Sequence, residues 1–292
     1  MQNFTHFNTD GEVFMVDVSV KKPIKRTASA IAKIVLSKDT IEKIQNNSLQ
    51  KGNALSAAKI AGIMAVKKTD ELIPLCHSLP IEHADLFFDF VQEGIEIKSL
   101  VVTTAKTGVE MEALIAVSVA ALCIYDMCKA VDKNIKIENI YLLEKKKFES
   151  FKIVSVNISE KKGEVKIPVS EVFLVENRGI ECDAHADGGN REVSLLSSEE
   201  INKLKQKGFD VNYGDFAENI TTNGVELDKL PIGTLLYLGE AILQITQIGK
   251  ECHSGCNIFQ KIGKCIMPEK GVFAKIIKGG KINNESNCYY CI

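Results

Sequence analysis

The chain has 292 residues, enough for two ordinary domains that each bury a core of their own. Its 36 Lys and Arg nearly balance 38 Asp and Glu, and neither half has a basic excess, which excludes a basic platform for nucleic acid. The longest apolar run has thirteen residues, too short to cross a bilayer, and the first residues lack a signal-peptide pattern. We therefore expect a cytoplasmic protein that binds small molecules and no membrane.

In the first half, the pattern predicts mixed helices and strands. Alternation predicts a strand at 14–19, and helical spacing follows at 39–45 and 53–65. Two strands, 84–90 and 95–104, flank Gly94 as an antiparallel pair, and a long helix and a closing strand at 135–143 come next. The basic run 145–147 is the predicted boundary, which gives domains 1–147 and 148–292.

In the second half, short alternating segments predict a strand-rich barrel or sandwich. They lie at 152–158, 164–169, 235–246 and 272–277, with one short helix at 197–207. The two predicted domains therefore differ in class.

The long helix of the first half carries ionisable residues at both ends of an apolar middle, so we expect it to be buried. Glu112 and Asp126 are fourteen residues apart, about 21 Å along a helix axis. One helix cannot bring both to one small substrate, so other segments must join each end or a second copy must complete the site. The alternative is that Glu110, Glu112, Asp126 and Lys129 are ordinary charges complementing the helix dipole.

Several residues of the first half have the chemistry of a phosphate site. Lys51 precedes a helix that starts at Asn53, so a lysine and free backbone amides face one point. We expect His77, in a loop after a proline, to lie among Lys51 and Lys67, and Arg26 to add a bidentate contact. The alternative is a structural histidine among solvated surface charges.

Six segments of residues 1–144 resemble the cyclic pyranopterin monophosphate synthase family (MoaC) of molybdenum cofactor biosynthesis. They are Thr5–Glu12, Met15–Ser19, Ile60–Ile63, Asp70–His77, Lys106–Leu114 and Ile124–Val131. The resemblance implies a ferredoxin-like α+β fold in a homo-oligomer, a hexamer built as a trimer of dimers, with sites at subunit interfaces. It also implies conversion of 3′,8-cyclo-7,8-dihydro-GTP to cyclic pyranopterin monophosphate with release of pyrophosphate.

This reaction opens and recloses rings without redox change, so it needs proton movers and anion holders and no flavin, nicotinamide or pyridoxal phosphate cofactor. The resemblance implies Lys51, Asp126 and Lys129 as the catalytic group. We expect burial to depress the pKa of Lys129 and so make it a competent proton donor near neutral pH. The residues it implies for substrate binding are Arg26, Lys67, Cys76, His77, Glu110, Met111 and Glu112.

The chain departs from this family's pattern at four positions and at the end of the domain. Ser78 replaces a usual proline, Ala105 a glycine, Asn53 an aspartate and Ile115 a threonine. The usual glycine, lysine and serine tail is replaced by 145–148. None of these changes removes a named catalytic side chain.

The nine cysteines form no disulfide framework, which is typical of a reducing compartment. Cys252 follows a strand at a predicted turn, with Lys250 and His253 nearby to lower its pKa, so it is a candidate nucleophile or sulfur carrier. The alternatives are inert cysteines or a zinc site. The spacings of Cys252, Cys256, Cys265, Cys288 and Cys291 match no standard zinc motif, so no metal site is predicted.

Residues 165–280 resemble the MOSC domain, the C-terminal module of molybdenum cofactor sulfurases. The matching segments include 183–186, 191–196, 214–222, 245–253 and 265–274. The resemblance implies a strand-rich barrel that binds molybdenum cofactor or carries a persulfide on Cys252, in a pocket lined by Asp183, His185, Arg191, Glu218 and Asn219. Cys182 and Ala217 stand at usual glycine positions, and the usual glycine-aspartate is missing from 283–288.

Together the two resemblances predict a bifunctional enzyme, a lyase joined to a module that handles cofactor or sulfur. The predicted partners are a nucleotide-derived substrate and other proteins of the molybdenum cofactor pathway. In one alternative the second half is a noncatalytic cofactor carrier, and in a weaker one neither half turns over.

Overall fold

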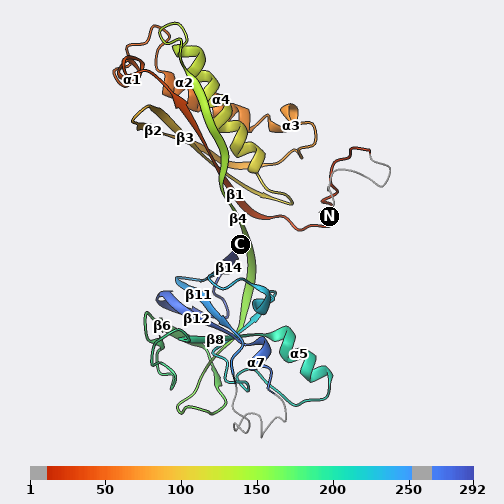
Figure 1. Ribbon diagram of the computed structural model, residues 1–292. Helices are drawn as coiled ribbons and strands as arrows, with labels where there is room; N and C mark the ends of the chain where they lie inside the picture. The colour runs from red at the N-terminus through yellow and green to blue at the C-terminus, as the bar shows by residue number, and fades with distance from the viewer. Residues whose placement is uncertain (1–11, 252–264) are drawn as a thin grey trace. The chain divides into compact units, whose positions relative to one another are not determined.

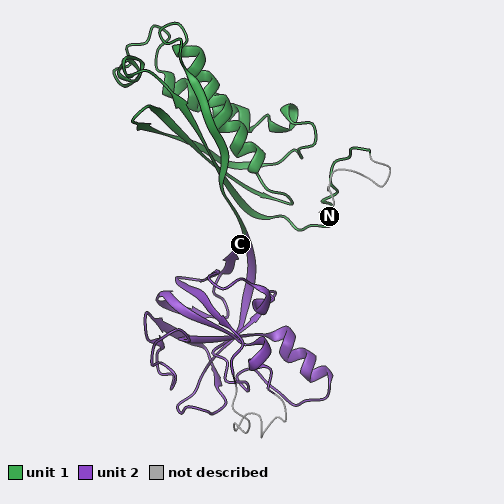
Figure 2. Ribbon diagram, in the orientation of Figure 1, with its two compact units in different colours: residues 1–147 green, residues 148–292 purple. Residues whose placement is uncertain are grey.

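The computed structural model describes residues 12–251 and 265–292 and divides into two compact units, residues 1–147 and 148–292 (Figure 2). Strand β4, Lys136–Ile158, contributes residues to both units. Each unit is described by itself.

Unit 1 has one sheet in the order β4-β1-β3-β2. Its strands, besides the first part of β4, are β1 (Ile24–Val35), β2 (Ile81–Val91) and β3 (Gly94–Ala105). Strands β1 and β2 both pair antiparallel with β3, as predicted for β2 and β3. At the turn between them Gly94 has φ of 150°, and a Cβ there would lie 1.9 Å from the Ile34 carbonyl oxygen, so only glycine fits.

Helices α2 and α4 of unit 1 lie together on its sheet (Figure 1). The helices are α1 (Lys38–Gln45), α2 (Ala54–Val66), α3 (Thr69–Leu72) and α4 (Glu110–Cys128). Helix α2 starts at Asn53, whose side chain accepts a hydrogen bond from the Ser56 amide (2.8 Å). The buried side of α4 is made of small residues, which permit close packing on α2 and the sheet: Ala113, Ala116, Val117, Ala120 and Ala121.

Two predictions for unit 1 are wrong. Residues 14–19 form no strand, and β1 carries the pairing instead, on a small-residue pattern that was not predicted. Burial of α4 is one-sided, because Leu122 and Tyr125 are 58% and 40% exposed.

Helix α4 is long and apolar enough to cross a membrane by length and composition, a test that core helices of soluble proteins also pass.

In unit 2, successive strand pairings lead from β4 through β14, β10, β11, β12, β8 and β9 back to β4. These strands are β8 (Val193–Ser197), β9 (Ile220–Asn223), β10 (Leu235–Leu238), β11 (Ala241–Ile248), β12 (Val272–Lys278) and β14 (Cys288–Cys291). Only β8 and β9 in this series run parallel.

The remaining elements of unit 2 flank these strands. They are β5 (Ile167–Val169) on β4, a second sheet of β6 (Glu171–Val175), β7 (Gly179–Ile180) and β13 (Gly280–Asn283), and the helices α5 (Ser198–Gln206), η1 (Leu227–Lys229) and α7 (Met267–Lys270).

Two strand predictions for unit 2 need correction. The segment 235–246 is a hairpin of β10 and β11, with Gly239 at φ of 59° in the turn. The predicted strand 164–169 is observed only as β5, Ile167–Val169, where Ile167 is 68% exposed, and Lys166 before it is buried. Lys166 is buried because it forms an ion pair with the buried carboxylate of Asp183.

A substitution in α2 tests the close packing of unit 1. A Cβ on Gly62 would lie 2.7 Å from a Leu86 methyl and 3.0 Å from the Ala116 carbonyl oxygen. We expect Gly62→Val to lower the free energy of unfolding by roughly 1–3 kcal/mol through overpacking, measured by urea denaturation. Ser56→Val, at an exposed position of the same helix, is the control, and equal effects of the two changes would contradict this packing.

Candidate functional site

Unit 1 has a cavity of about 310 Å³ at the N-terminal end of α4. The predicted binding residues that line it are Cys76, His77, Glu110, Met111 and Glu112. Five of the seven residues predicted to bind substrate therefore share one cavity.

Glu112 is the buried carboxyl of this cavity, only 4% exposed. Burial raises its pKa to about 7, and the charges of Glu110 and Asp70 add to the shift. Burial also raises the pKa of the Cys76 thiol, and the charges of Glu112 and Asp70 add to that rise. The cavity lining thus includes a carboxyl that exchanges its proton near neutral pH, Glu112, and a thiol that stays protonated, Cys76.

The segment that precedes β1 forms another wall of this cavity, through Val16, Val18 and Lys21. The Nε2 atom of His77 lies 2.9 Å from the Val16 carbonyl oxygen, and Lys106 Nζ donates to the Ser19 carbonyl oxygen (2.7 Å). The sequence analysis assigned this segment to a strand and so missed its role as a wall.

The two remaining predicted binding residues, Arg26 and Lys67, do not line the cavity, whereas Glu110 does. Arg26 does not face a ligand freely, because Nε and Nη2 donate to the carbonyl oxygens of Ala105 (3.2 Å) and Lys106 (3.3 Å). Lys67 is exposed at the C-terminus of α2. Glu110 pairs with Lys145 (3.2 Å between Nζ and Oε1), a lysine of the altered tail.

The predicted catalytic residues gather at the opposite end of α4. Lys51 Nζ donates to Asp126 Oδ2 (2.8 Å) and to its carbonyl oxygen (2.9 Å), and Lys129 Nζ lies 2.6 Å from Asp126 Oδ1. Hydrogen bonds from Lys129 and Lys51 lower the pKa of Asp126 to about 2. The cluster therefore holds two ammonium groups on one carboxylate and carries a net positive charge.

The expected depression of the Lys129 pKa is wrong for the single chain. Its side chain is 57% exposed, and the hydrogen bond and charge of Asp126 raise its pKa. Without burial there is no desolvation to favour the neutral amine, so Lys129 is an ammonium ion at neutral pH.

The two clusters lie at opposite ends of the helix pair α2 and α4. Lys51 precedes α2 and contacts the C-terminal end of α4, so α2 runs antiparallel to α4. The expected grouping of Lys51 with His77 is therefore wrong. The chain is helical throughout from Glu112 to Asp126, a separation of fourteen residues, which keeps the clusters about 21 Å apart along the axis of one chain.

Unit 2 has a larger cavity, of about 580 Å³, within the size range of small-molecule sites. Three of the predicted pocket residues line it, His185, Arg191 and Asn219, and the glycine-rich turn 187–190 forms part of its rim. Lys166, Lys250 and Phe273 also line it. Lys166 and Phe273 were not predicted, because a lysine and a phenylalanine in alternating strands carry no separate signal.

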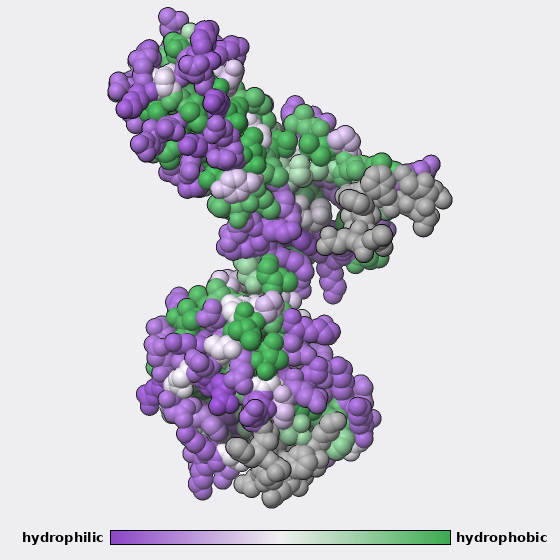
Figure 3. Space-filling model, viewed as in Figure 1, coloured by the Kyte–Doolittle hydropathy of each residue, from purple (hydrophilic) through white to green (hydrophobic). Residues whose placement is uncertain are grey.

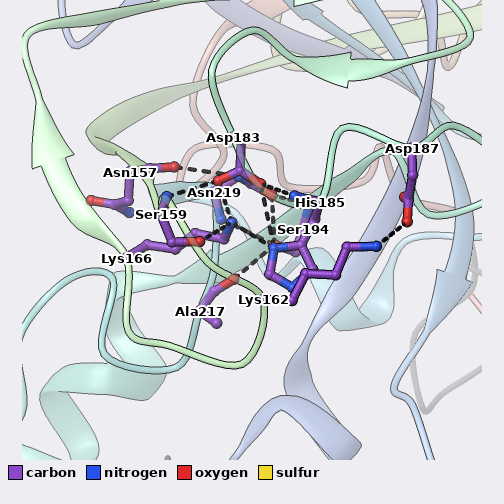
Figure 4. Close-up of polar contacts among 10 residues, drawn as sticks. All are labelled: Asn157, Ser159, Lys162, Lys166, Asp183, His185, Asp187, Ser194, Ala217 and Asn219. Carbon is purple, nitrogen blue, oxygen red and sulfur yellow. Dashed lines mark hydrogen bonds and ion pairs between the residues drawn. The ribbon is translucent and has the colours of Figure 1, made fainter.

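A buried ion pair underlies this cavity (Figure 4). Lys166 Nζ lies 2.5 Å from Asp183 Oδ2, and both side chains are 2% exposed. Burial opposes the charge of Asp183, but hydrogen bonds, among them those donated by Lys166 and by the amides of Ser159 and His185, outweigh it and lower the pKa of Asp183. Burial lowers the pKa of Lys166, against the pull of Asp183.

Two cations of the cavity share one aromatic ring. The guanidinium of Arg191 lies 5.8 Å and the ammonium of Lys250 6.0 Å from the centre of the Phe273 ring. Neither has an ion-pair partner within 12–251 and 265–292. Their charge thus remains available to an anionic ligand.

Of the last two predicted pocket residues, one faces the cavity and one does not. Asn219 accepts hydrogen bonds from the Ser194 amide (3.2 Å) and hydroxyl (2.9 Å), which fixes it at the cavity wall. Glu218 is fully buried and accepts from the Gly214 amide (2.7 Å) and the Thr221 hydroxyl (3.0 Å). Burial raises the Glu218 pKa to about 7, but its role is to hold its own loop.

The glycine replacements in unit 2 have a visible conformational cost. Cys182 and Ala217 have φ of 64° and 62°, the left-handed region that glycine enters freely. A side chain there costs roughly 1–2 kcal/mol, so the fold tolerates these replacements under strain.

Some of the predictions for the cysteines concern residues that the structure does not describe. Cys252, His253 and Cys256 lie in 252–264, which the structure does not describe. Among the residues that it does describe, no group of three His, Cys, Asp or Glu side chains could hold a metal ion.

Comparisons with known proteins match each half separately. Residues 15–147 match the MoaC family, and residues 183–285 match the MOSC domain. The cyclic pyranopterin monophosphate synthase of Heliobacterium modesticaldum is 50% identical over 147 residues, which are 50% of this chain and 92% of that protein. The synthase of Desulfitobacterium hafniense is 52% identical over 142 residues, 48% of this chain and 87% of that protein.

Among solved structures, YiiM from Geobacillus stearothermophilus is 20% identical with a TM-score of 0.39, over 48% of this chain and 74% of that chain. The YUAD protein from Bacillus subtilis is 16% identical with a TM-score of 0.43, over 50% of this chain and 97% of that chain.

The α+β first unit, with its charged groups at both ends of α4, and the strand-rich second unit thus define a two-part protein of the molybdenum cofactor class. The chain belongs to the MoaC family through its first half, and it carries a MOSC domain in its second. Homology of the first half supports cyclic pyranopterin monophosphate synthesis, a lyase activity.

The raised pKa of Glu112 predicts a pH dependence of stability. Because the pKa of Glu112 is about 7 in the folded chain, against an ordinary value of 4.5, the folded chain holds the proton more tightly. Its ionisation therefore lowers stability as pH rises from about 4.5 to about 7. We expect Glu112→Gln to remove this loss and to raise the free energy of unfolding at pH 8 by up to about 3 kcal/mol, measured by denaturation at pH 5 and 8. The control is Glu71→Gln, an exposed carboxyl, and the same gain in both variants would contradict the assignment.

The buried pair of unit 2 predicts unequal effects of two aspartates. Asp183→Asn leaves the Lys166 ammonium buried without a charge partner and should cost roughly 3–5 kcal/mol of unfolding free energy. Asp187→Asn breaks the exposed pair with Lys162 (2.6 Å) and should cost about 1 kcal/mol or less. Thermal and urea denaturation measure both, and comparable losses would refute the burial of the pair.

Proposed function

We propose that the protein is bifunctional, with residues 1–147 a cyclic pyranopterin monophosphate synthase domain and residues 148–292 a MOSC domain that handles molybdenum cofactor or sulfur. The observation that supports the first activity most directly is the pair of clusters at the ends of α4, because each matches one predicted role. The substrate is 3′,8-cyclo-7,8-dihydro-GTP, and the products are cyclic pyranopterin monophosphate and pyrophosphate.

Lys51, Asp126 and Lys129 form the catalytic group in this proposal. To close the cyclic phosphodiester, a substrate hydroxyl attacks the α-phosphorus and pyrophosphate is expelled. One lysine ammonium gives a proton to the leaving pyrophosphate, and the resulting amine takes up the proton of the hydroxyl. The ammonium groups of Lys51 and Lys129, held on the ionised Asp126, stabilise the negative charge of the leaving group and supply protons. Asp126 keeps both lysines protonated and oriented.

The cavity at the other end of α4 holds the pterin-forming ring. Glu110 and Glu112 accept hydrogen bonds from the guanine-derived edge, and His77 and Cys76 line the opposite wall. Met111 provides apolar contact there. Lys67 and Arg26 add positive charge at the rim. For Arg26, this role requires that its hydrogen bonds to the carbonyl oxygens of Ala105 and Lys106 hold the guanidinium beside the cavity.

A second copy of the chain completes each site. A substrate cannot span 21 Å, so the catalytic end of one subunit meets the binding cavity of another. Exposed apolar residues on the outer side of α2 and α4 support association, and Figure 3 shows hydrophobic surface among the hydrophilic on unit 1. They are Ile60, Met64, Leu122 and Tyr125. We expect the family's hexamer, a trimer of dimers, in the cytoplasm.

Architecture supports the proposed domain classes. The element order of unit 1, with sheet order β4-β1-β3-β2 and helices between, supports a ferredoxin-like fold. The pairings of unit 2 that return to β4 support a MOSC-type barrel. The synthase reaction proceeds without a cofactor.

For the second half we propose binding of molybdenum cofactor or relay of sulfur through Cys252. The cavity fits an anionic cofactor, because Arg191 and Lys250 line it without carboxylate partners among the described residues, and Asn219 offers amide contacts. Bound cofactor would supply the molybdenum chemistry. Cys252 follows Lys250 by two residues in the sequence. The alternative is a carrier module without catalysis, working beside other proteins of the pathway.

An activity assay tests the first half. Full-length protein incubated with 3′,8-cyclo-7,8-dihydro-GTP should release pyrophosphate and a pterin product. We expect Lys51→Ala, Asp126→Asn and Lys129→Ala each to lower kcat at least about a hundredfold by removing proton transfer and charge stabilisation. The control Lys133→Ala, one turn beyond Lys129, should keep normal activity. Absence of product with the unaltered chain would refute the enzyme proposal.

A trapping experiment separates sulfur relay from cofactor binding in the second half. If sulfur is relayed, incubation with a persulfide donor should leave a persulfide on Cys252, detected by mass spectrometry of alkylated peptides. Cys252→Ser should abolish this label, whereas Cys265→Ser should not. Labelling of several cysteines alike would argue for the carrier alternative.

A further inference from the structure

Lys166 stands at the base of the unit 2 cavity with every proton of its ammonium group assigned (Figure 4). Its Nζ lies 2.5 Å from Asp183 Oδ2, 3.3 Å from His185 Nδ1 and 3.4 Å from Ser159 Oγ. An ammonium group has three donors and no acceptor. The three neighbours therefore have to accept, and His185 accepts through Nδ1.

This contact decides which nitrogen of His185 carries the proton. An Nδ1–H would point at the ammonium of Lys166 and remove one of its acceptors. Asp183 Oδ1 does not reverse the preference, since it lies 3.5 Å from Nδ1 and already accepts from the His185 amide (3.0 Å). The neutral ring thus carries its proton on Nε2.

The ring edge away from Lys166 belongs to the cavity wall. The side chain of His185 is 39% exposed, whereas Lys166 and Asp183 beneath it are 2% exposed. Arg191 and Lys250 line the same cavity, and Asp187 on its rim is paired with Lys162. Two cations, Arg191 and Lys250, and one neutral N–H donor, His185, then face the cavity. The nearby carboxylates of Asp183 and Asp187 are each already paired with a lysine.

We propose that Lys166 is a positioning residue that holds His185 in its Nε2–H form, so that His185, Arg191 and Lys250 together bind an oxyanion of the ligand. The inference rests on the proposed binding of an anionic ligand in this cavity and adds the residue that orients its neutral donor. A phosphate monoester or diphosphate group has the required chemistry, because its oxygens accept from all three side chains.

Neutron diffraction from crystals of the full chain, exchanged into D₂O, observes the proton directly. We expect deuterium on Nε2 of His185 and none on Nδ1, with three deuterons on Lys166 Nζ. Deuterium on Nδ1 of a neutral ring would overturn the proposal.

Two substitutions of His185 test the donor in solution. A glutamine amide can stand in for Nε2–H and an asparagine amide for Nδ1–H. The probe is inorganic pyrophosphate, titrated by calorimetry into full-length protein carrying Lys51→Ala and Lys129→Ala, which removes the cations of the proposed synthase cluster. We expect His185→Gln to bind within about threefold of the unaltered cavity and His185→Asn to bind at least about tenfold more weakly.

The outcomes distinguish this inference from the function on which it rests. No pyrophosphate binding before any change at His185 would contradict the anionic cavity and the inference together. Binding that His185→Asn retains as well as His185→Gln would overturn the inference alone. The synthase assay, run without the two lysine changes, reports separately on the first half.

A double variant tests Lys166 itself without leaving a buried charge. Lys166→Met with Asp183→Asn removes both charges, and we expect pyrophosphate affinity to fall at least about tenfold in protein that denaturation shows to be folded. The matched control is Lys229→Met with Glu226→Gln, an exposed pair of unit 2 that does not line the cavity, which should bind normally. Normal binding by the Lys166 variant would contradict the positioning role, and the neutron experiment does not depend on its folding.

Discussion

The length of helix α4 determines which residues of the first half can reach one another within a single chain. Helix α4 is continuous from Glu110 to Cys128, and its small inward residues fix it against α2 and the sheet. Its two ends therefore cannot move toward each other. In the proposed synthase, the carboxylates at one end and the lysine–aspartate cluster at the other would form a single catalytic unit only through association of copies, which would link activity to assembly.

Electrostatics differs between the two ends in a way that suits different tasks. At the cavity end, burial raises the pKa of Glu112 to about 7 and so makes the carboxyl a group that can gain or lose a proton. At the other end, Asp126 is exposed and stays ionised between two lysines. Unit 2 also has a lysine paired with an aspartate, but this pair, Lys166 and Asp183, is fully buried. It contacts His185 and does not meet solvent.

Much of the fold could be predicted from local pattern, and the failures have physical reasons. Helices α2 and α4 and the hairpin of β2 and β3 carry clear periodicity and turn signals. Strand β1 was missed because its buried residues are largely alanines, which mark a buried face weakly. The burial of Lys166 could not be predicted, because alternation cannot report an aspartate seventeen residues away in the chain.

The candidate site shows the same limit. The resemblance named residues at both ends of α4, and helix geometry alone predicted that they lie apart. The wall formed by Val16 and Lys21 and the pairing of Glu110 with Lys145 depend on tertiary contacts that no local pattern encodes. Burial of Lys129 was predicted from an apolar sequence context, but a helix end can remain exposed while its middle is buried.

Subunit complementation tests the shared site most directly. One chain carries Asp126→Asn and Lys129→Ala, the other His77→Ala and Glu112→Gln, and each is inactive alone. If two subunits complete each site, refolding or expressing the chains together should restore up to about a quarter of normal synthase activity, since that share of sites combines two intact ends. Mixed oligomers that form but remain inactive would contradict the account, because they would show that both ends must act within one chain.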